Sequence, residues 1–161
     1  LLDAEYANLF EKFGQIGLQL DKVQRMFFQR LFWFTFETGL VHTPVGLKVY
    51  GGSLLSSIKE SRYAVDNPLP LRQDFNMIDI FRTSYRADLI QSIYYIALDF
   101  SQFLTMLDDV NLIKKNIEIA YESGEFSPLF PIEEKYSKYT NYNICKFIKP
   151  QQLLVQNKIK I

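Results

Sequence analysis

The sequence lacks several features on which common classes of protein depend. A single cysteine, Cys145, excludes an internal disulfide framework and fits a reducing compartment. The apolar stretch at residues 26–36 is interrupted by Gln29 and Arg30, so we expect no membrane-spanning helix. The 18 basic and 18 acidic residues cancel, so no net charge attracts the chain to nucleic acid or an acidic membrane. We therefore expect a cytoplasmic protein without a nucleic-acid or membrane partner; its oligomeric state is unknown from the sequence, and a monomer is favoured.

Histidine is equally scarce, which limits the chemistry that this chain can perform alone. His42 is the only histidine, so we expect neither a catalytic triad nor a histidine-rich metal site. It lies beside a predicted turn, where an exposed histidine is favoured over a functional one. The sequence also has no glycine-rich phosphate loop, no CxxC and no HExxH motif. It begins "LLDAEYANLF", without an initiator methionine or a signal-peptide pattern, so we expect a processed chain or a piece of a longer one.

What the chain does contain is enough apolar sequence for one folded domain. It has 161 residues, of which 48% are hydrophobic. We expect this domain to span residues 1–126 and the tail, 127–161, to be loosely ordered. The fold class is mainly α with a small β-hairpin or sheet, that is α+β. Periodicity and turn signals predict helices at 2–13, 22–36, from Ser56 or Ser57, and at 100–121; a hairpin around 43–46; strand pieces at 82–86 and 92–97; and a loop at 66–72.

Local signals fix the ends of several of these elements. Asp21 is a good N-cap, with Gln24 three residues later in the position of a capping-box partner. Gly39 is a plausible C′ residue at the other end of that helix. Gly14 and Gly17 interrupt the chain after the first helix. Asp99 is expected to cap the last helix, and Gly124 to end it.

The stretch "FWFTFETGL", residues 32–40, places one carboxylate, Glu37, at the end of an aromatic run. An ionised carboxylate is tolerated in apolar surroundings only when a cation, a metal or several donors satisfy it. From the pattern alone, an exposed position at the helix end is favoured. The helix dipole disfavours a negative charge at this end, which argues for some external reason for the glutamate.

The glycine pair that follows the hairpin has two interpretations. Gly51-Gly52-Ser53 is either a turn or bulge, or a place where the backbone comes close to a ligand. Ser56 and Ser57 are more typical of helix caps than of site residues.

Two motifs together resemble the pterin-dependent aromatic amino acid hydroxylases. "RLFWFTFETGLV" (30–41) is similar to that family's "LYWFTVEFGL", and "LKVYGGSLLSSIKES" (47–61) to its "YGAGLLSS". "RTSYRADLIQSIYYIALDF" (82–100) resembles the family's strand pair, and the opening "LLDAEYANLFEKFGQIGL" the helix after its iron-binding histidines. The resemblance covers about residues 1–107 and is closest to the short, single-domain phenylalanine 4-monooxygenase type. It implies that family's catalytic-domain fold, truncated at its N-terminus.

The resemblance implies a mononuclear Fe(II) held by two histidines and a glutamate, with open positions for dioxygen and substrate. The glutamate maps onto Glu37. The family's two histidines lie upstream of the matching helix and are not in this sequence, and His42 matches neither. We therefore expect the chain alone to be inactive and to retain iron poorly.

Other positions carry over individually. Trp33 matches an aromatic wall of the amino-acid pocket, Phe32 the ring against the pterin, Ser56 a hydrogen-bonding serine near an iron-ligand histidine, and Tyr85 a tyrosine at the site mouth. Three positions depart from the family pattern: Gln29 replaces a small residue beside the pterin, Thr38 a pocket Phe, and Ser53 a Gly near the substrate. A changed pocket wall alters discrimination by about 1–3 kcal/mol per contact, so it bears on which aromatic substrate is used.

The expected function is therefore a tetrahydropterin- and Fe(II)-dependent monooxygenase of phenylalanine catabolism, which hydroxylates phenylalanine to tyrosine. Tetrahydrobiopterin or another tetrahydropterin would be the co-substrate. Two alternatives stay open: a family member that acts on tyrosine or tryptophan, and a non-catalytic helical binding domain that keeps the scaffold.

Overall fold

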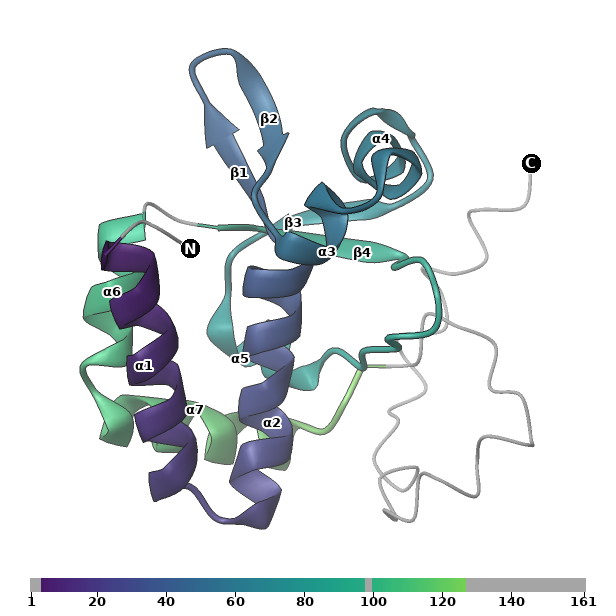
Figure 1. The fold of residues 1–161 in the computed structure, drawn as a ribbon. Helices are drawn as coiled ribbons and strands as arrows, with labels where there is room; N and C mark the ends of the chain where they lie inside the picture. The colour runs from purple at the N-terminus through teal and green to yellow at the C-terminus, as the bar shows by residue number, and fades with distance from the viewer. Residues whose placement is uncertain (1–3, 98–99, 127–161) are drawn as a thin grey trace.

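The computed structural model describes residues 4–97 and 100–126 (Figure 1). Most of this part is helical, and a small sheet lies between two groups of helices. The helices are α1 (Ala4–Gln19), α2 (Lys22–Phe32), the π-helix η1 (Trp33–Glu37), α3 (Gly52–Leu55), α4 (Ile58–Asp66), α5 (Met77–Arg82), α6 (Phe100–Leu107) and α7 (Val110–Ser123). The strands are β1 (Leu40–Thr43), β2 (Gly46–Val49), β3 (Leu71–Asp74) and β4 (Ile93–Ala97). The mainly α fold with a small sheet is thus confirmed.

The sheet is mixed and has the strand order β2-β1-β4-β3. β1 and β2 form the expected hairpin, antiparallel, with Thr43 opposite Gly46. Gly46 has a φ of 107°, a conformation that suits glycine. β4 runs parallel to both β1 and β3. Parallel neighbours on both sides place β4 in the interior, where side chains on both of its faces are covered.

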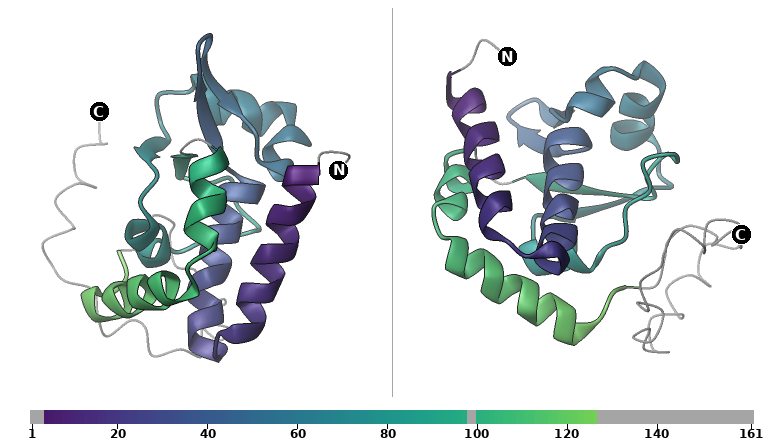
Figure 2. Two further views of the ribbon diagram at one scale, coloured as in Figure 1. Left: turned by 90° about the vertical axis from the view of Figure 1, so that its left-hand side faces the viewer. Right: turned by 60° about the horizontal axis from the view of Figure 1, so that its bottom comes forward.

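Alternation along β4 divides the core in two. Tyr95 packs with the larger group of buried residues, which comes from α1, α2, η1, α5, α6 and α7. Tyr94 points to the opposite face and packs with Leu40, Leu54 and Ala64 under α3 and α4. In both views of Figure 2, α7 runs crosswise to α1 and α2. In the described part of the chain, no helix combines the length and apolarity needed to cross a membrane.

The start of α2 follows the local signals in the sequence. Asp21 accepts a hydrogen bond from Gln24 N at 2.8 Å, and the Gln24 side chain accepts one from Asp21 N at 3.1 Å. This reciprocal capping box is the one that the spacing predicts. Ser57 likewise caps α4 by accepting from Glu60 N.

The first and last predicted helices have different bounds in the structure. α1 continues through Gly14 and Gly17 to Gln19, because Ile16 and Leu20 bury their side chains in the core and outweigh the helix cost of glycine. The helix predicted at 100–121 is two helices, α6 and α7, with Asp109 capping α7 through Leu112 N. Gly124 does end α7, with a φ of 74°. Asp99 and the tail lie outside the described residues.

Two predictions in the middle of the chain are wrong. The expected loop at 66–72 contains the start of β3, whose residues pair with β4 over Leu71–Asp74. The expected strand at 82–86 does not form: α5, which the pattern did not predict, is capped by Asn76 and ends at Arg82. The strand predicted at 92–97 is β4.

Candidate active site

α2 continues directly into the π-helix η1 (Trp33–Glu37), a single π-turn that ends at Glu37. Thr38 N donates to Trp33 O at 3.0 Å, five residues back, and the Thr38 hydroxyl donates to the same carbonyl at 3.0 Å. Phe34, Thr35 and Phe36 are buried, whereas Trp33 and Glu37 are half-buried. π-turns inside helices frequently mark functional sites. Here Trp33 and Glu37 are the residues of the turn that stay partly exposed.

Two glycines allow the chain after the hairpin to pack directly on this turn. Tyr50 N and Gly51 N both donate to Gly39 O at 3.1 Å. A Cβ on Gly51 would lie 2.4 Å from Glu37 O, and one on Gly39 would lie 2.3 Å from Thr35 O. Gly39 therefore does not serve as a left-handed C′ residue but as a contact point. The close approach that the glycine pair suggested is between two backbones of this chain.

Tyr85 supplies an aromatic wall against the π-turn. Its ring stacks on Trp33, with centroids 5.2 Å apart and planes at 11°, and meets the Phe34 ring edge-on at 5.2 Å. Its hydroxyl lies near the Thr38 side chain and the carboxylates of Glu37 and Glu60. Burial, followed by these two negative charges, raises the pKa of Tyr85 to about 12, and the Thr38 side chain opposes the rise.

Glu60, on the first turn of α4, is a part of this arrangement that the sequence did not reveal. Tyr94 Oη donates to Glu60 Oε1 at 3.2 Å. Burial and the Glu60 carboxylate raise the pKa of Tyr94. In the sequence, Glu60 is three residues after the cap Ser57, and helix capping is a sufficient explanation for an acid there.

The structure brings together some of the predicted site residues and separates others. Trp33, Glu37, Thr38 and Tyr85 lie together at the π-turn. α3, which carries Ser53, packs against that turn. Two other predicted site residues are exposed: Ser56, which donates to Ser53 O at 2.7 Å, and Gln29 on α2. His42, which was expected to be an exposed histidine, is exposed on β1.

Phe32 turns toward α1 rather than into an open space. Its ring lies edge-on to Phe10, tilted on Phe13 and stacked on Phe36, with centroids 5.3–5.8 Å apart. These contacts anchor α1 to the end of α2. The predicted role of Phe32 beside a pterin stays a prediction.

Glu37 is a single carboxylate and does not make a metal site by itself. In residues 4–97 and 100–126, no three His, Cys, Asp or Glu side chains gather where they could hold a metal ion. The residues present thus do not fit a complete Fe(II) site, which needs two further protein ligands of the facial-triad kind.

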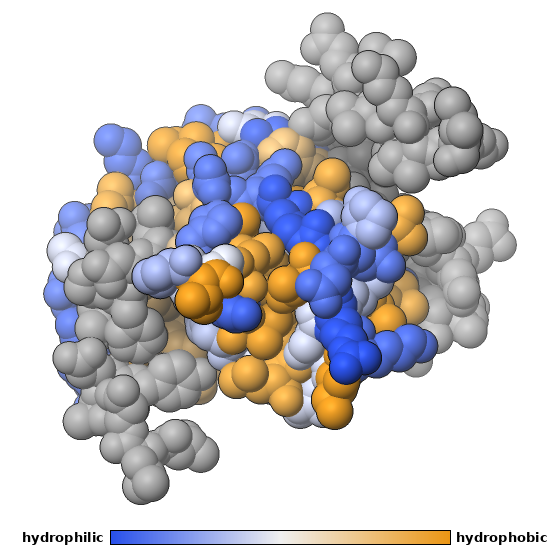
Figure 3. Space-filling view, turned by 90° about the horizontal axis from the view of Figure 1, so that it is seen from above, coloured by the Kyte–Doolittle hydropathy of each residue, from blue (hydrophilic) through white to orange (hydrophobic). Residues whose placement is uncertain are grey.

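The face above the sheet carries several exposed apolar side chains. Val45 at the hairpin tip, Leu55 in α3 and Ile58 in α4 are all more than half exposed. Seen from above, apolar side chains occupy the middle of this face and hydrophilic ones flank them (Figure 3).

Comparisons with known proteins identify the class to which this arrangement belongs. Residues 1–150 match the family described as biopterin-dependent aromatic amino acid hydroxylases, and the chain belongs to this family. Over 126 residues it is 36% identical to the phenylalanine-4-hydroxylase of Pseudomonas aeruginosa, covering 78% of this chain and 47% of that protein. Over 137 residues it is 36% identical to the phenylalanine-4-hydroxylase of Vibrio cholerae, and this match covers 84% of this chain and 46% of that protein.

A solved structure agrees with these sequence matches. The apo structure of the cold-active phenylalanine hydroxylase from Colwellia psychrerythraea 34H superimposes with a TM-score of 0.75 at 39% identity. The match covers 81% of this chain and 50% of that one. The predicted resemblance and fold are confirmed, and the chain spans about half the length of the curated relatives it matches.

The two glycines at 51 and 52 make a matched test of the backbone contact. We expect Gly51→Ala to destabilise the fold by about 1–3 kcal/mol, because its Cβ would collide with the Glu37 peptide, whose atoms cannot rotate away. At Gly52 the nearest atom, Phe36 O, is 3.7 Å from an added Cβ, so Gly52→Ala should change stability by no more than about 0.5 kcal/mol. Urea unfolding of both variants measures the difference. Equal stability of the two would contradict the close packing.

The buried tyrosines predict how stability depends on pH. The folded protein retains the Tyr85 proton up to a pKa of about 12, whereas the unfolded chain loses it near 10.0. Stability from this group is therefore fully present below pH 10 and is lost as pH rises toward 12. The pKa values of Tyr94 and Tyr95 are raised as well, so these two residues make the loss of stability with rising pH steeper.

Urea unfolding between pH 9 and pH 11 should show this fall, and Tyr85→Phe should make it shallower. Glu37→Gln should lower the Tyr85 pKa in an absorbance titration, because it removes one of the two charges. Glu122→Gln, on the exposed side of α7, is the matched control and should leave it unchanged. An unshifted Tyr85 titration in the folded chain would show that the wall is open to water.

Proposed function

We propose that this chain supplies one wall of the active site of a phenylalanine 4-monooxygenase, which forms tyrosine from phenylalanine with a tetrahydropterin and dioxygen. The observation that carries the proposal is the Trp33–Tyr85 stack beside Glu37, in a chain that belongs to the aromatic amino acid hydroxylases. The matched relatives in Pseudomonas aeruginosa and Vibrio cholerae are both named phenylalanine-4-hydroxylase, which supports phenylalanine as the substrate.

In this proposal the aromatic pair orients the substrate ring. The half-buried Trp33 offers an aromatic surface that is held in place by the parallel Tyr85 ring behind it. Aromatic pairs prefer offset-stacked or edge-on contacts, so a substrate ring would be restricted to few orientations. Thr38 is buried and its hydroxyl donates to Trp33 O, so it supports the wall rather than contacting the substrate freely.

We propose Glu37 as one carboxylate ligand of Fe(II), the oxygen-activating centre of such an enzyme. Its place at a half-buried helix end, fixed by the Gly51 contact, suits a ligand whose position must not vary. The proposal requires further metal ligands that this sequence does not contain. Ser53 on the adjacent α3 and Ser56, the residue that caps the end of α3, would then lie on the substrate side, and Phe32 and Gln29 on the pterin side.

The lone carboxylate favours one alternative. Because no described cluster can hold a metal, a non-catalytic binding domain that keeps the hydroxylase scaffold would need nothing more than the residues seen here. Cytoplasmic location, dioxygen as co-substrate and a monomeric state also belong to the proposal.

An exchange experiment tests the function. In the Colwellia psychrerythraea phenylalanine hydroxylase, the half that this chain matches is replaced by this chain, and tyrosine formation from phenylalanine is measured with and without a tetrahydropterin. We expect pterin-dependent product. Glu37→Gln should reduce it by at least about 100-fold, because even the loss of a residue that only supports a metal ligand costs 10–100-fold. Glu122→Gln should have no effect.

Tyrosine and tryptophan serve as competing substrates in the same assay and decide between the family members. A folded exchange protein that takes up one iron per chain but forms no pterin-dependent product from any aromatic amino acid would contradict the proposal. That result would favour the binding domain.

A further inference from the structure

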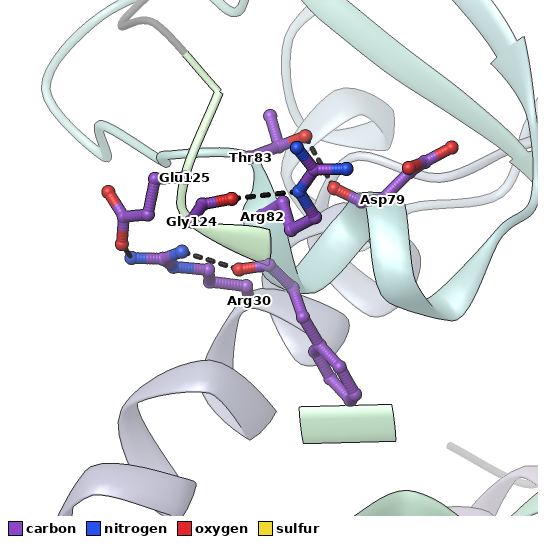
Figure 4. Close-up of polar contacts among 7 residues, drawn as sticks. Arg30, Asp79, Arg82, Thr83, Gly124 and Glu125 are labelled. Carbon is purple, nitrogen blue, oxygen red and sulfur yellow. Dashed lines mark hydrogen bonds and ion pairs between the residues drawn. The ribbon is translucent and has the colours of Figure 1, made fainter. Parts of the chain in front are cut away.

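An ion pair near the C-terminal end of α2 connects three segments that are distant in the sequence. Arg30 is buried, and its guanidinium donates to Phe81 O at the end of α5 and pairs with Glu125, just after α7 (Figure 4). The same guanidinium lies over the Phe27 ring, 5.0 Å from its centroid. Arg30 is one turn before Trp33, whose backbone N–H donates to Arg30 O. The pair thus sits directly under the π-turn.

The segment after α7 is held on α5 by contacts of its own. Arg82 Nε donates to Gly124 O at 2.8 Å (Figure 4). Phe126 N donates to Arg82 O at 2.8 Å. The Arg82 guanidinium lies over the Phe126 ring, 4.0 Å from its centroid. Residues 124–126 therefore join the end of α5 to α2. We call these residues, together with Arg30 and Arg82, the clasp.

The end of α5 leads straight to the aromatic wall. The Thr83 hydroxyl bonds Asp79 O and the Tyr95 hydroxyl, each at 2.7 Å. Tyr95 meets Phe34 of the π-turn edge-on at 5.2 Å. Two residues after Thr83, Tyr85 stacks on Trp33. The distance between α2 and the chain at 83–85, and with it the geometry of the Trp33–Tyr85 stack, thus depends on how firmly α5 is held.

We propose that Arg30 and Glu125 are positioning residues for the Trp33–Tyr85 wall, acting through the end of α5. A buried guanidinium needs a charge partner, and Glu125, itself largely buried, supplies it. Without that charge, the buried guanidinium of Arg30 would be unpaired, which is costly, so we expect it to turn toward water and to release Phe81 O. The consequence for substrate orientation rests on the proposed function, but the positioning itself does not.

Trp33 is the only tryptophan of the chain, so its spectra report on this wall alone. Glu125→Gln keeps the shape and removes the charge. At a temperature where the chain stays folded by far-ultraviolet circular dichroism, we expect a weaker near-ultraviolet tryptophan band. We also expect acrylamide quenching of Trp33 to rise by roughly two-fold, because the unpaired cation opens the clasp.

Three variants separate positioning from mere loss of stability. Asp108→Asn removes an exposed ion pair with Lys12 and should leave the Trp33 signals unchanged. Asp21→Ala removes the capping box at the start of the same helix, so it lowers stability without touching the clasp. Phe126→Leu removes the ring under Arg82 and should move the Trp33 signals in the same direction as Glu125→Gln.

Unchanged Trp33 quenching in a folded Glu125→Gln chain would overturn the proposal. So would an equal change in Asp21→Ala. If Glu125→Gln fails to fold, Phe126→Leu decides by the same measurement. The test needs no turnover, so failure of the positioning role and failure of the hydroxylase function are seen in different experiments.

Discussion

The arrangement depends most on the contact between Gly51 and the peptide of Glu37. The two backbone segments lie so close that a Cβ on Gly51 would have no room, and two hydrogen bonds to Gly39 O stabilise this contact. It ends the helix in a π-turn, directs β1 into the sheet and places α3 beside Glu37. A half-buried carboxylate at the C-terminal end of a helix is electrostatically unfavourable. Such a residue is kept in place by packing from outside the helix, and the glycine contact provides that packing.

A second constraint acts from the opposite side of the wall. Tyr85 reaches Trp33 only because α5 ends at Arg82, close to α2, and the buried Arg30 guanidinium links the two elements. Polar groups of the wall find partners within the chain: Thr38 with Trp33 O, Thr83 with Tyr95, and Tyr94 with Glu60. Satisfied buried hydrogen bonds specify one arrangement of a core, whereas unsatisfied ones are costly. These hydrogen bonds therefore favour one arrangement of the wall.

How much of this the sequence predicted follows from the range of each interaction. The Asp21 cap, the hairpin and the end of α7 at Gly124 depend on neighbouring residues, and their patterns predicted them correctly. The π-turn, β3 and the end of α5 depend on partners far along the chain. Leu71–Asp74, a mostly polar segment, becomes a strand because it pairs with β4. The residues before Tyr85 do not form the predicted strand, because their contacts are with α2 and with the residue after α7. Of the site, Trp33, Glu37, Thr38 and Tyr85 were placed together only through the family resemblance, and Glu60 was missed because capping explained it.

In the proposed function, the Trp33 indole, backed by Tyr85, is a wall of the substrate pocket of a hydroxylase. Isotope-filtered NMR of ring-labelled phenylalanine bound to the exchange enzyme tests this directly. The account predicts nuclear Overhauser contacts between the substrate ring and the Trp33 indole, at distances below about 5 Å that suit aromatic pairs. Bound phenylalanine that is turned over without any contact to Trp33 would contradict it.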